Sequence, residues 1–295
     1  MSLRITPLTD PDSGPYSRRL AWLASDAAGS PVGTAFLRLF TDGGQDHLAE
    51  LAVHVHPVER RGGIGSRLLD VAVAAARDDA RRAVIVQTEA GAPGASFLSA
   101  RGFRTVLTFR YTRLALADVD VAALARIVGR ARPGYRLESW HGTVPDGLAE
   151  TFAASRRAMD DMPMGDTDYG TMTWDVDRVR AVSRAVEERG DHLHTVVAVD
   201  TSDGSIAGFT ELVVPGKGKG KGDGQHYGTA VLPEHRGHGL GLWMKAESIS
   251  QARTRYPDLA GLLTDTADNN THMRHINDGL GYTPTHEALM YQLDL

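Results

Sequence analysis

Hydrophobic and polar positions along the chain predict strands and helices in mixed order. Short apolar or alternating runs, which favour strands, recur between stretches with apolar residues at three- and four-residue spacing, which favour helices. Up to Leu116, the predicted strands are 18–24, 32–40, 51–55, 83–86 and 108–116, with a helix at 66–78 and a second helix before Gly102. Strands interspersed with helices predict a mixed sheet of the α/β class.

The second half of the chain repeats this order and adds to it. Two extra helices are predicted first, at 146–159 and 176–188. The strands and the helix that follow are 195–199, 206–214, 227–232, 242–255, 259–264 and 287–295, with a turn at 202–204 between the first two strands. The first copy has the same hairpin but no room for the two helices before it. The chain is therefore expected to be a tandem repeat whose first copy is shortened.

Both copies contain the pattern P-x-x-R-x-x-G-x-G between a predicted strand and a predicted helix, at residues 57–65 and 233–241. A helix N-terminus offers unpaired N–H groups and a partial positive charge, and glycine lets the backbone approach a phosphate closely. One such pattern is often only a tight turn. Its duplication in the same strand–turn–helix context favours a site for a pyrophosphate-bearing cofactor in each copy.

Composition narrows the function classes. With 295 residues the chain is long enough for two domains, and 42% hydrophobic residues are ordinary for a globular protein. A net charge of −5 argues against nucleic-acid binding, and the absence of cysteine excludes disulfides, thiolate metal sites and a cysteine nucleophile. The histidine spacings match no common zinc pattern, so no metal is expected. No secretory signal or long apolar run is present, so we expect a cytoplasmic protein that does not enter a membrane.

The dinucleotide pattern G-x-G-x-x-G and the P-loop pattern G-x-x-x-x-G-K-[ST] do not fit these turns. The chain resembles instead the GNAT superfamily of acyl-CoA-dependent N-acyltransferases, whose turn reads [RQ]-x-x-G-x-[GA]. The resemblance implies acetyl-CoA as cofactor and two tandem GNAT-like domains: 1–117, which lacks acceptor-lid helices, and 135–295, which is catalytic, with a linker at 118–134. The residues that it implies for cofactor binding are Val231, Arg236, Gly237, His238, Gly239, Leu240, Gly241 and Asn270 in the second copy, and Val55, Arg60, Arg61, Gly62, Gly63, Ile64 and Gly65 in the first.

Direct attack of an amine on a thioester needs a group that takes the amine proton. Many members of the family place a Glu near the start of the strand before the turn; Glu50 stands there in the first copy and His226 in the second. Glu211, in an apolar stretch of the preceding strand, is the other candidate base, although an outward-facing, solvated carboxylate is the simpler interpretation. The tyrosine that many members use as acid is replaced by Leu98 and Asn277, so the proton donor stays open.

Acidic residues between the two extra helices suggest the acceptor. Asp160 and Asp161, followed by Asp166 and Asp168, would attract a cationic amine, although a solvated acidic loop is equally ordinary. Trp174 could line an apolar pocket beside them, and Asp265 adds to the acidic character. These residues favour a small, cationic primary amine as substrate.

Two alternatives stay open from the sequence. One is a non-catalytic acyl-CoA sensor, and the other is catalysis in the first copy with Glu50 as base. A monomer and a homodimer are both compatible with the sequence. The lysine–glycine stretch at 217–222 is expected to be a solvated loop extension or, alternatively, a basic flap near a phosphate.

Overall fold

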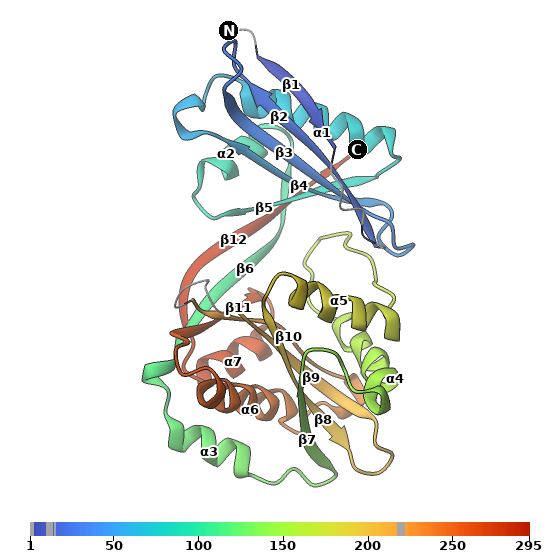
Figure 1. Cartoon of the computed structure of the whole chain (residues 1–295), viewed down its shortest axis with the longest axis vertical. Helices are drawn as coiled ribbons and strands as arrows, with labels where there is room; N and C mark the ends of the chain where they lie inside the picture. Colours follow the sequence, from blue (N-terminus) through green and yellow to red (C-terminus); the bar gives the residue numbers. More distant parts are fainter. Residues whose placement is uncertain (1–2, 10–13, 15, 217–221) are drawn as a thin grey trace. The chain divides into compact units, whose positions relative to one another are not determined.

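The computed structural model of the chain describes residues 3–9, 14, 16–216 and 222–295 (Figure 1). It divides into two compact units. Unit 1 comprises Met1–Thr108, Met164–Thr173 and Glu287–Leu295, and unit 2 comprises Phe109–Pro163 and Trp174–His286. The lysine–glycine stretch lies outside the described residues except for Gly222. The predicted mixed α/β class with two tandem copies is confirmed.

Unit 1 is a mixed sheet with helices packed on it. Its strand order is β1-β2-β3-β4-β5-β12, in which β4 and β5 are parallel and the other neighbours within the unit are antiparallel. The strands are β1 (Arg4–Leu8), β2 (Ser17–Ser25), β3 (Pro31–Phe40), β4 (Leu48–Val55), β5 (Ala83–Glu89) and β12 (Thr283–Asp294). The helices are α1 (Ile64–Asp78), α2 (Pro93–Ala100) and the 3-10 turn η1 (Pro57–Glu59).

Unit 2 has the strand order β6-β11-β10-β9-β8-β7, with β10 and β11 parallel. The strands are β6 (Arg104–Ala115), β7 (Tyr135–His141), β8 (His192–Asp200), β9 (Ile206–Val214), β10 (Gly224–Val231) and β11 (Gly261–Ala267). The helices are α3 (Val121–Gly129), α4 (Asp146–Ser155), α5 (Val176–Glu188), α6 (Leu240–Arg255) and α7 (Thr271–Gly279), with 3-10 turns η2 (Leu116–Asp118), η3 (Arg156–Met159) and η4 (Pro233–His235).

The last strand of each sequence copy pairs within the other compact unit. Strand β6 passes into unit 2 at Phe109, where its residues through Ala115 pair antiparallel with β11. Strand β12 passes into unit 1 at Glu287, where Ala288 to Asp294 pair antiparallel with β5. The boundaries 1–117, 118–134 and 135–295 therefore describe the repeat in the sequence, whereas the compact units are assembled from exchanged strands.

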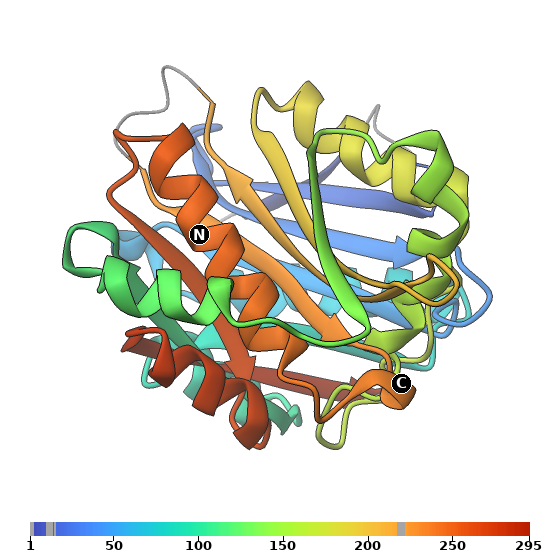
Figure 2. The same cartoon turned by 90° about the horizontal axis from the view of Figure 1, so that it is seen from below.

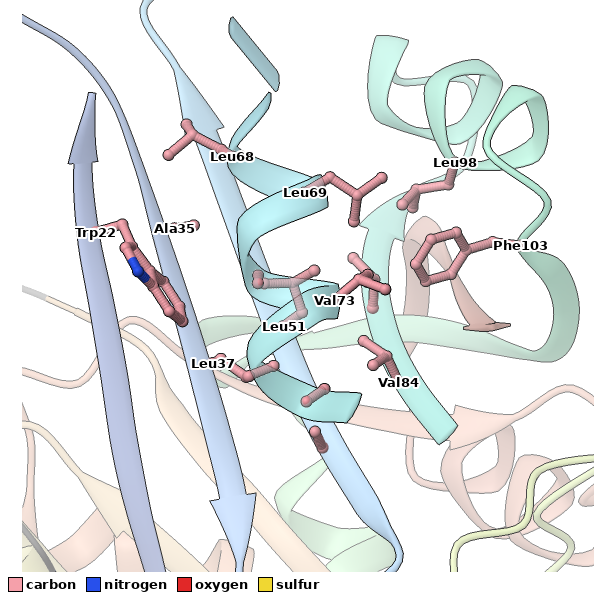
Figure 3. Close-up of a cluster of buried hydrophobic side chains, with 14 of the residues drawn as sticks. Trp22, Ala35, Leu37, Leu51, Leu68, Leu69, Val73, Val84, Leu98 and Phe103 are labelled. Carbon is pink, nitrogen blue, oxygen red and sulfur yellow. The ribbon is translucent and has the colours of Figure 1, made fainter. Parts of the chain in front are cut away.

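The cores follow the hydrophobic patterns. In unit 1, α1 buries residues at three- and four-residue spacing, among them Leu68, Leu69 and Val73, against apolar residues of the strands (Figure 3). In unit 2, both faces of the sheet are covered: α6 and α7 pack on one face, and α4 and α5 on the other (Figure 2). Burial on both faces explains why every residue of β9 is buried.

Candidate active site

The duplicated turns have the same local geometry in both units. In unit 2, the Arg236 side chain donates a hydrogen bond from Nε to the carbonyl of Val231 at 3.0 Å, which ties the turn to β10. In unit 1, Arg60 makes the equivalent bond to Val55 at 3.2 Å. The residues before α6 and α1, Gly239 and Gly63, have φ of 73° and 79°, a left-handed conformation that glycine adopts without strain.

These helix N-termini have open backbone donors. Neither α1 nor α6 has a side-chain cap, and the first amides within each helix precede the first intrahelical hydrogen bonds. A Cβ placed on Gly63 or Gly237 would meet no atom within 4 Å. The backbone thus faces open space beside unpaired N–H groups, which suits the pyrophosphate of a CoA molecule.

The strand before each turn separates from its parallel neighbour. The β4–β5 ladder has its last rung at Glu50 and Ile85, although β4 continues to Val55. The β10–β11 ladder likewise stops at Gln225 and Leu263, while β10 continues to Val231. Beyond the last rung, backbone N–H and C=O groups on the facing edges have no strand partner in the part of the chain that the structure describes. Such edges can take the amides of an extended arm such as pantetheine.

His226 aligns with Glu50 in the sequence, but a bulge directs its side chain to the opposite face of its own sheet. In unit 1, Ala49 and Leu51 pack toward α1, so alternation directs Glu50 to the opposite face, where its side chain is half exposed. In unit 2, the β10–β9 register shifts between His226 and Gly228. The His226 side chain consequently faces α6, fully enclosed in the protein, while Tyr227 at the bulge is 61% exposed.

His226 and Asn277 belong to a buried polar network between the sheet of unit 2 and its helices α6 and α7. His226 contacts Ser248 Oγ at 3.3 Å through Nε2 and the Tyr282 hydroxyl at 2.9 Å through Nδ1. Lys245 donates from Nζ to Asn277 Oδ1 at 2.5 Å, and Asn277 Nδ2 donates to Thr266 Oγ1 at 3.1 Å.

The ionisation of this network is set by burial. Desolvation lowers the pKa of Lys245 to about 7, partly opposed by Asp265. Desolvation, then the charges of Lys245 and His194, keep the pKa of His226 well below its usual value. Burial raises the pKa of Tyr282 above its usual value. The network therefore holds a neutral imidazole and a lysine that loses its proton near neutrality, and both polar groups of Asn277 are already engaged.

Glu211 lies on the other face of the unit 2 sheet in a closed ion pair. Arg156 donates to both carboxylate oxygens, at 2.7 and 2.6 Å, and both side chains are buried. The guanidinium also lies over the rings of Trp174, Phe152 and Phe209, at 4.5 to 4.8 Å from their centroids. A carboxylate enclosed in this way serves as the structural ion-pair partner of Arg156. The Trp174 ring covers the guanidinium that binds it.

The acidic residues expected near the acceptor belong to different units. Asp161 pairs with Arg236 in unit 2 at 2.6 and 2.8 Å, and this hydrogen-bonded pair lowers the pKa of Asp161. Burial and the charge of Asp161 raise the pKa of Asp160. Asp166 and Asp168 lie instead in the unit 1 segment Met164–Thr173.

Two other expected site residues have local partners. Asp265 accepts a hydrogen bond from Gln225 at 3.3 Å, and burial raises the pKa of its carboxyl. The Asn270 side chain caps α7 by accepting from the Met273 amide at 3.2 Å.

Arg132, Tyr135 and Ser248 are residues near the site that the sequence analysis did not identify. Arg132, in the linker after α3, has its guanidinium 3.5 to 3.8 Å from where a Cβ on Gly239 would lie, and its Nε is buried without a hydrogen-bond partner. The Tyr135 hydroxyl lies 3.1 Å from His235 Nδ1, and its ring lies 5.3 Å from that of His238. Arg132 and Tyr135 precede the repeat motif by about a hundred residues, so motif spacing contained no signal for them.

Comparison with known proteins identifies the family. The model of the acetyltransferase (GNAT) family matches residues 5–103 and 159–282, in both copies. The chain belongs to the GNAT family. It is an acetyl-CoA-dependent N-acetyltransferase with a tandem layout.

Individual relatives extend this result. A mycothiol acetyltransferase of Nocardia farcinica (strain IFM 10152) is 29% identical over 248 residues, which cover 83% of this chain and 75% of that protein. A tandem GNAT protein from the clavulanic acid biosynthesis pathway has a similar fold, with a TM-score of 0.80, 22% identity and coverage of 99% and 98% of the two chains. A GCN5-related N-acetyltransferase from Sphaerobacter thermophilus gives a TM-score of 0.65 with 15% identity, covering 93% of this chain and 80% of that one.

Residues 3–9, 14, 16–216 and 222–295 contain neither a membrane-spanning helix nor a metal-binding cluster. Within these ranges, no helix has the length and apolar character needed to cross a bilayer. Nor do three or more histidine, aspartate or glutamate side chains gather there as a metal ion would require.

Proposed function

We propose that the chain transfers the acetyl group of acetyl-CoA to a primary amine of a small molecule by direct attack, and that both units bind acetyl-CoA. The observation that carries this proposal is the duplicated combination of an uncapped, left-handed glycine turn and a strand pair that separates beside it. Bound acetyl-CoA would supply the activated acyl group. The residues that would hold it are Val231, Arg236, Gly237, His238, Gly239, Leu240 and Gly241 in unit 2, and Val55, Arg60, Arg61, Gly62, Gly63, Ile64 and Gly65 in unit 1.

Each part of the turn has its own task. The first amides of the helix would donate hydrogen bonds to phosphate oxygens, and the helix dipole would favour the negative charge. The free edges of β10 and β4 would donate and accept hydrogen bonds along the pantetheine arm. In unit 2, Arg236 is already paired with Asp161, so a phosphate has to share or displace that carboxylate, whereas Arg60 in unit 1 forms no ion pair with a carboxylate of the described residues.

A small acceptor is favoured over a macromolecular one. The net charge of −5 opposes nucleic-acid binding, and the relative in N. farcinica is named for a small-molecule acetylation. The cationic character expected of the acceptor depends on fewer carboxylates than the sequence suggested, because Asp161 is neutralised by Arg236 and Asp166 and Asp168 lie in unit 1.

We propose two candidate residues for the base that takes the amine proton. In the C-terminal copy, where the sequence analysis expects catalysis, Glu211 can take this role once Arg156 releases it. The second candidate is Glu50 in unit 1. It is favoured by its place on the last β4–β5 rung and by its half-exposed carboxylate, which lies 3.7 Å from the Arg38 guanidinium.

The test begins with calorimetric titration of acetyl-CoA into the wild type, Gly239→Trp and Gly63→Trp. We expect two equivalents bound by the wild type and one by each variant, because each indole occupies one phosphate turn. Gly204→Trp is the matched control, since Gly204 also has a positive φ and open space but lies in a hairpin turn. Wild-type protein that binds no acetyl-CoA would exclude the proposal.

Release of CoA thiol is then measured with a panel of amino sugars, polyamines, amino acids and aminoglycosides. The rates of Glu50→Gln and Glu211→Gln with the best amine decide between the two bases, and Glu150→Gln on the exposed surface of α4 is the control. A loss confined to one variant assigns the base, because removing it is expected to slow turnover by about 100-fold or more.

A further inference from the structure

A short segment that follows helix α4 contacts the glycine-rich turn of unit 2. The segment, called the strap below, is residues 157–161, which form the end of the 3-10 turn η3 and the two residues after it. The preceding residue, Arg156, is buried in its bidentate ion pair with Glu211. Ala158 is also buried, in the apolar core that α4 and β9 share. The start of the strap is therefore firmly held in unit 2.

Two ion pairs join the strap to the turn. Both oxygens of the Asp161 carboxylate accept hydrogen bonds from Arg236, at 2.6 Å from Nη1 and 2.8 Å from Nη2. Arg157 pairs in the opposite sense with Glu234 of η4. All four side chains are about half exposed. Exposed ion pairs contribute little to stability, so both pairs can open without unfolding the unit.

The Asp161 carboxylate occupies the edge of Arg236 that would bind a phosphate. Nε of Arg236 donates to the carbonyl of Val231 at 3.0 Å, so the two terminal nitrogens are the donors left for an external anion. Carboxylate and phosphate groups both bind such a guanidinium edge in a bidentate manner. The hydrogen bonds from Arg236 lower the pKa of Asp161, so this competing group is charged at neutral pH.

Unit 1 has the same turn without a strap. Arg60 binds the carbonyl of its own strand at 3.2 Å, as Arg236 does in unit 2, but it forms no ion pair with a carboxylate of the described residues. Val58, which matches Glu234 in the sequence, is 79% exposed and offers no charge to an arginine. The first copy also lacks the two extra helices, α4 and α5, between which the strap lies. The strap is thus a property of unit 2 and is not needed to form the turn.

We propose that residues 157–161 are an autoinhibitory strap, in which Asp161 competes with phosphate for Arg236 and is displaced when acetyl-CoA binds in unit 2. The inference rests on the proposed binding of acetyl-CoA and adds to it a control of unit 2 by its own chain. Asp161 and the pyrophosphate carry like charges, so they repel each other beside one guanidinium. Once Asp161 is displaced, Arg157 alone joins the strap to the turn, and the strap opens while Arg156 keeps its start in place. Unit 1, which has no strap, is the site that fills first.

The binding test measures each site alone by calorimetry. In the Gly63→Trp background only the unit 2 turn is open to acetyl-CoA, and Asp161→Asn is expected to lower its Kd by about tenfold, because the competing charge is removed. In the Gly239→Trp background, Asp161→Asn should leave the Kd of unit 1 unchanged. Asp146→Asn is the matched control, since it removes the same charge from an ion pair with Arg180 that does not involve the turn.

The two single-site backgrounds also compare the units directly. We expect acetyl-CoA to bind more tightly to Gly239→Trp than to Gly63→Trp, and Asp161→Asn to reduce this difference. A unit 2 Kd that Asp161→Asn leaves unchanged, or that Asp146→Asn lowers equally, would overturn the proposal. Failure of the proposed function gives a different result, because the wild type would then bind no acetyl-CoA.

A second test detects the opening of the strap and uses the absence of cysteine from the chain. The Met159 side chain is half-buried, and its methyl group lies 3.6 Å from where a Cβ on Gly228 of β10 would be. Met159→Cys places a thiol at this contact. Its reaction with N-ethylmaleimide is expected to become several-fold faster with bound S-acetonyl-CoA, a thioether analogue that has no acetyl group to transfer.

Two further substitutions assign this increase to the strap. Adding Gly239→Trp should remove it, and adding Asp161→Asn should produce it without the analogue. Ala154→Cys is the control, since this exposed position on α4 precedes Arg156 and its thiol should react at one rate throughout. A Met159→Cys rate that S-acetonyl-CoA leaves unchanged or lowers, in protein that calorimetry shows to bind it, would refute displacement of the strap.

Discussion

Under the sheet of each unit, three matched positions carry different chemistry. The sixth residue of the helix after the turn, a residue of the next helix and the aromatic that follows it are Leu69, Leu98 and Phe103 in unit 1, but Lys245, Asn277 and Tyr282 in unit 2. In unit 1 these side chains pack in one apolar core, as Figure 3 shows. In unit 2 they form hydrogen bonds with one another and with His226.

The opposite faces of the two sheets also differ, but there the exposed carboxylate belongs to unit 1. Unit 1 leaves the carboxylate of Glu50 half exposed, whereas unit 2 buries Glu211 against Arg156. The turn and the separating strands are nevertheless the same in both units. The difference teaches that the geometry of the turn depends on backbone conformation and glycines, while the side chains around it are apolar in one copy and ionisable in the other.

The largest expected effect comes from comparing the buried ion pair Arg156–Glu211 of unit 2 with the exposed ion pair Arg38–Glu50 of unit 1. Arg156→Met should lower the free energy of unfolding by about 3–5 kcal/mol, because Glu211 then stays buried without its partner. Arg38→Met, beside the exposed Glu50, should cost less than about 1 kcal/mol. Urea unfolding measures both, and Arg156→Met combined with Glu211→Leu should recover most of the loss. Similar effects of the two single substitutions would contradict the contrast.

The second prediction concerns how the segment Met164–Thr173 is held in unit 1 by its contact with the loop before β4. Gly170→Ala should lower the free energy of unfolding by about 1–3 kcal/mol, because it combines a left-handed φ with overlap against Gly44. Gly204→Ala is the matched variant, with φ of 79° and open space, and should cost about 1 kcal/mol or less. Limited proteolysis should cut Gly170→Ala within residues 164–173 before the wild type. Equal protease resistance of Gly170→Ala and the wild type would show that the contact between Gly170 and Gly44 does not hold this segment in place.

The third prediction uses the pH dependence of Lys245. Its folded pKa of about 7 lies below its unfolded value, so between pH 7 and about 10 the unfolded chain binds more protons. Wild-type stability should therefore rise with pH over this range relative to Lys245→Leu, by at most about 1.4 kcal/mol per pH unit. Urea unfolding at several pH values measures the difference. A difference that stays constant from pH 7 to 10 would show that Lys245 is not held neutral.

The smallest expected effect separates the two phosphate turns. Arg132→Gln should weaken acetyl-CoA binding in unit 2 by about tenfold, since its guanidinium lies beside Gly239 and gives a charge-assisted contact to phosphate. Binding in unit 1 should not change. Arg130→Gln in the same linker is the control, and calorimetry at two salt concentrations is the measurement. Equal weakening at both sites, or none at either, would remove Arg132 from the phosphate site.

Local sequence patterns contained most of the elements and both turns, although they predicted neither β1 nor β7. The repeat P-x-x-R-x-x-G-x-G places Gly63 and Gly239 at helix N-termini, and the hairpins and the helix at 176–188 follow from hydrophobic spacing. These features depend on neighbours within a few residues, which is the range that propensity and periodicity describe.

The features that the sequence did not contain depend on distant contacts. Strands β6 and β12 have ordinary strand patterns, but a pattern does not name the strand with which it pairs. The single-residue bulge that turns His226 toward α6 leaves no mark in an alignment without gaps. Arg156 lies on a predicted helix as any exposed arginine would, so its partner Glu211, whose simpler interpretation was a solvated carboxylate, could be recognised only in three dimensions.

The exchange of final strands has a consequence for biosynthesis. Strand β5 of unit 1 receives its partner only when residues 288–294 leave the ribosome, after every strand of unit 2 has been made. Until then the edge of β5 is unpaired, a state prone to wrong pairing in a crowded cell. The nascent chain thus completes its first-made unit last, and each copy of the repeat made alone would lack the strand that pairs with β5 or β11 in the full chain.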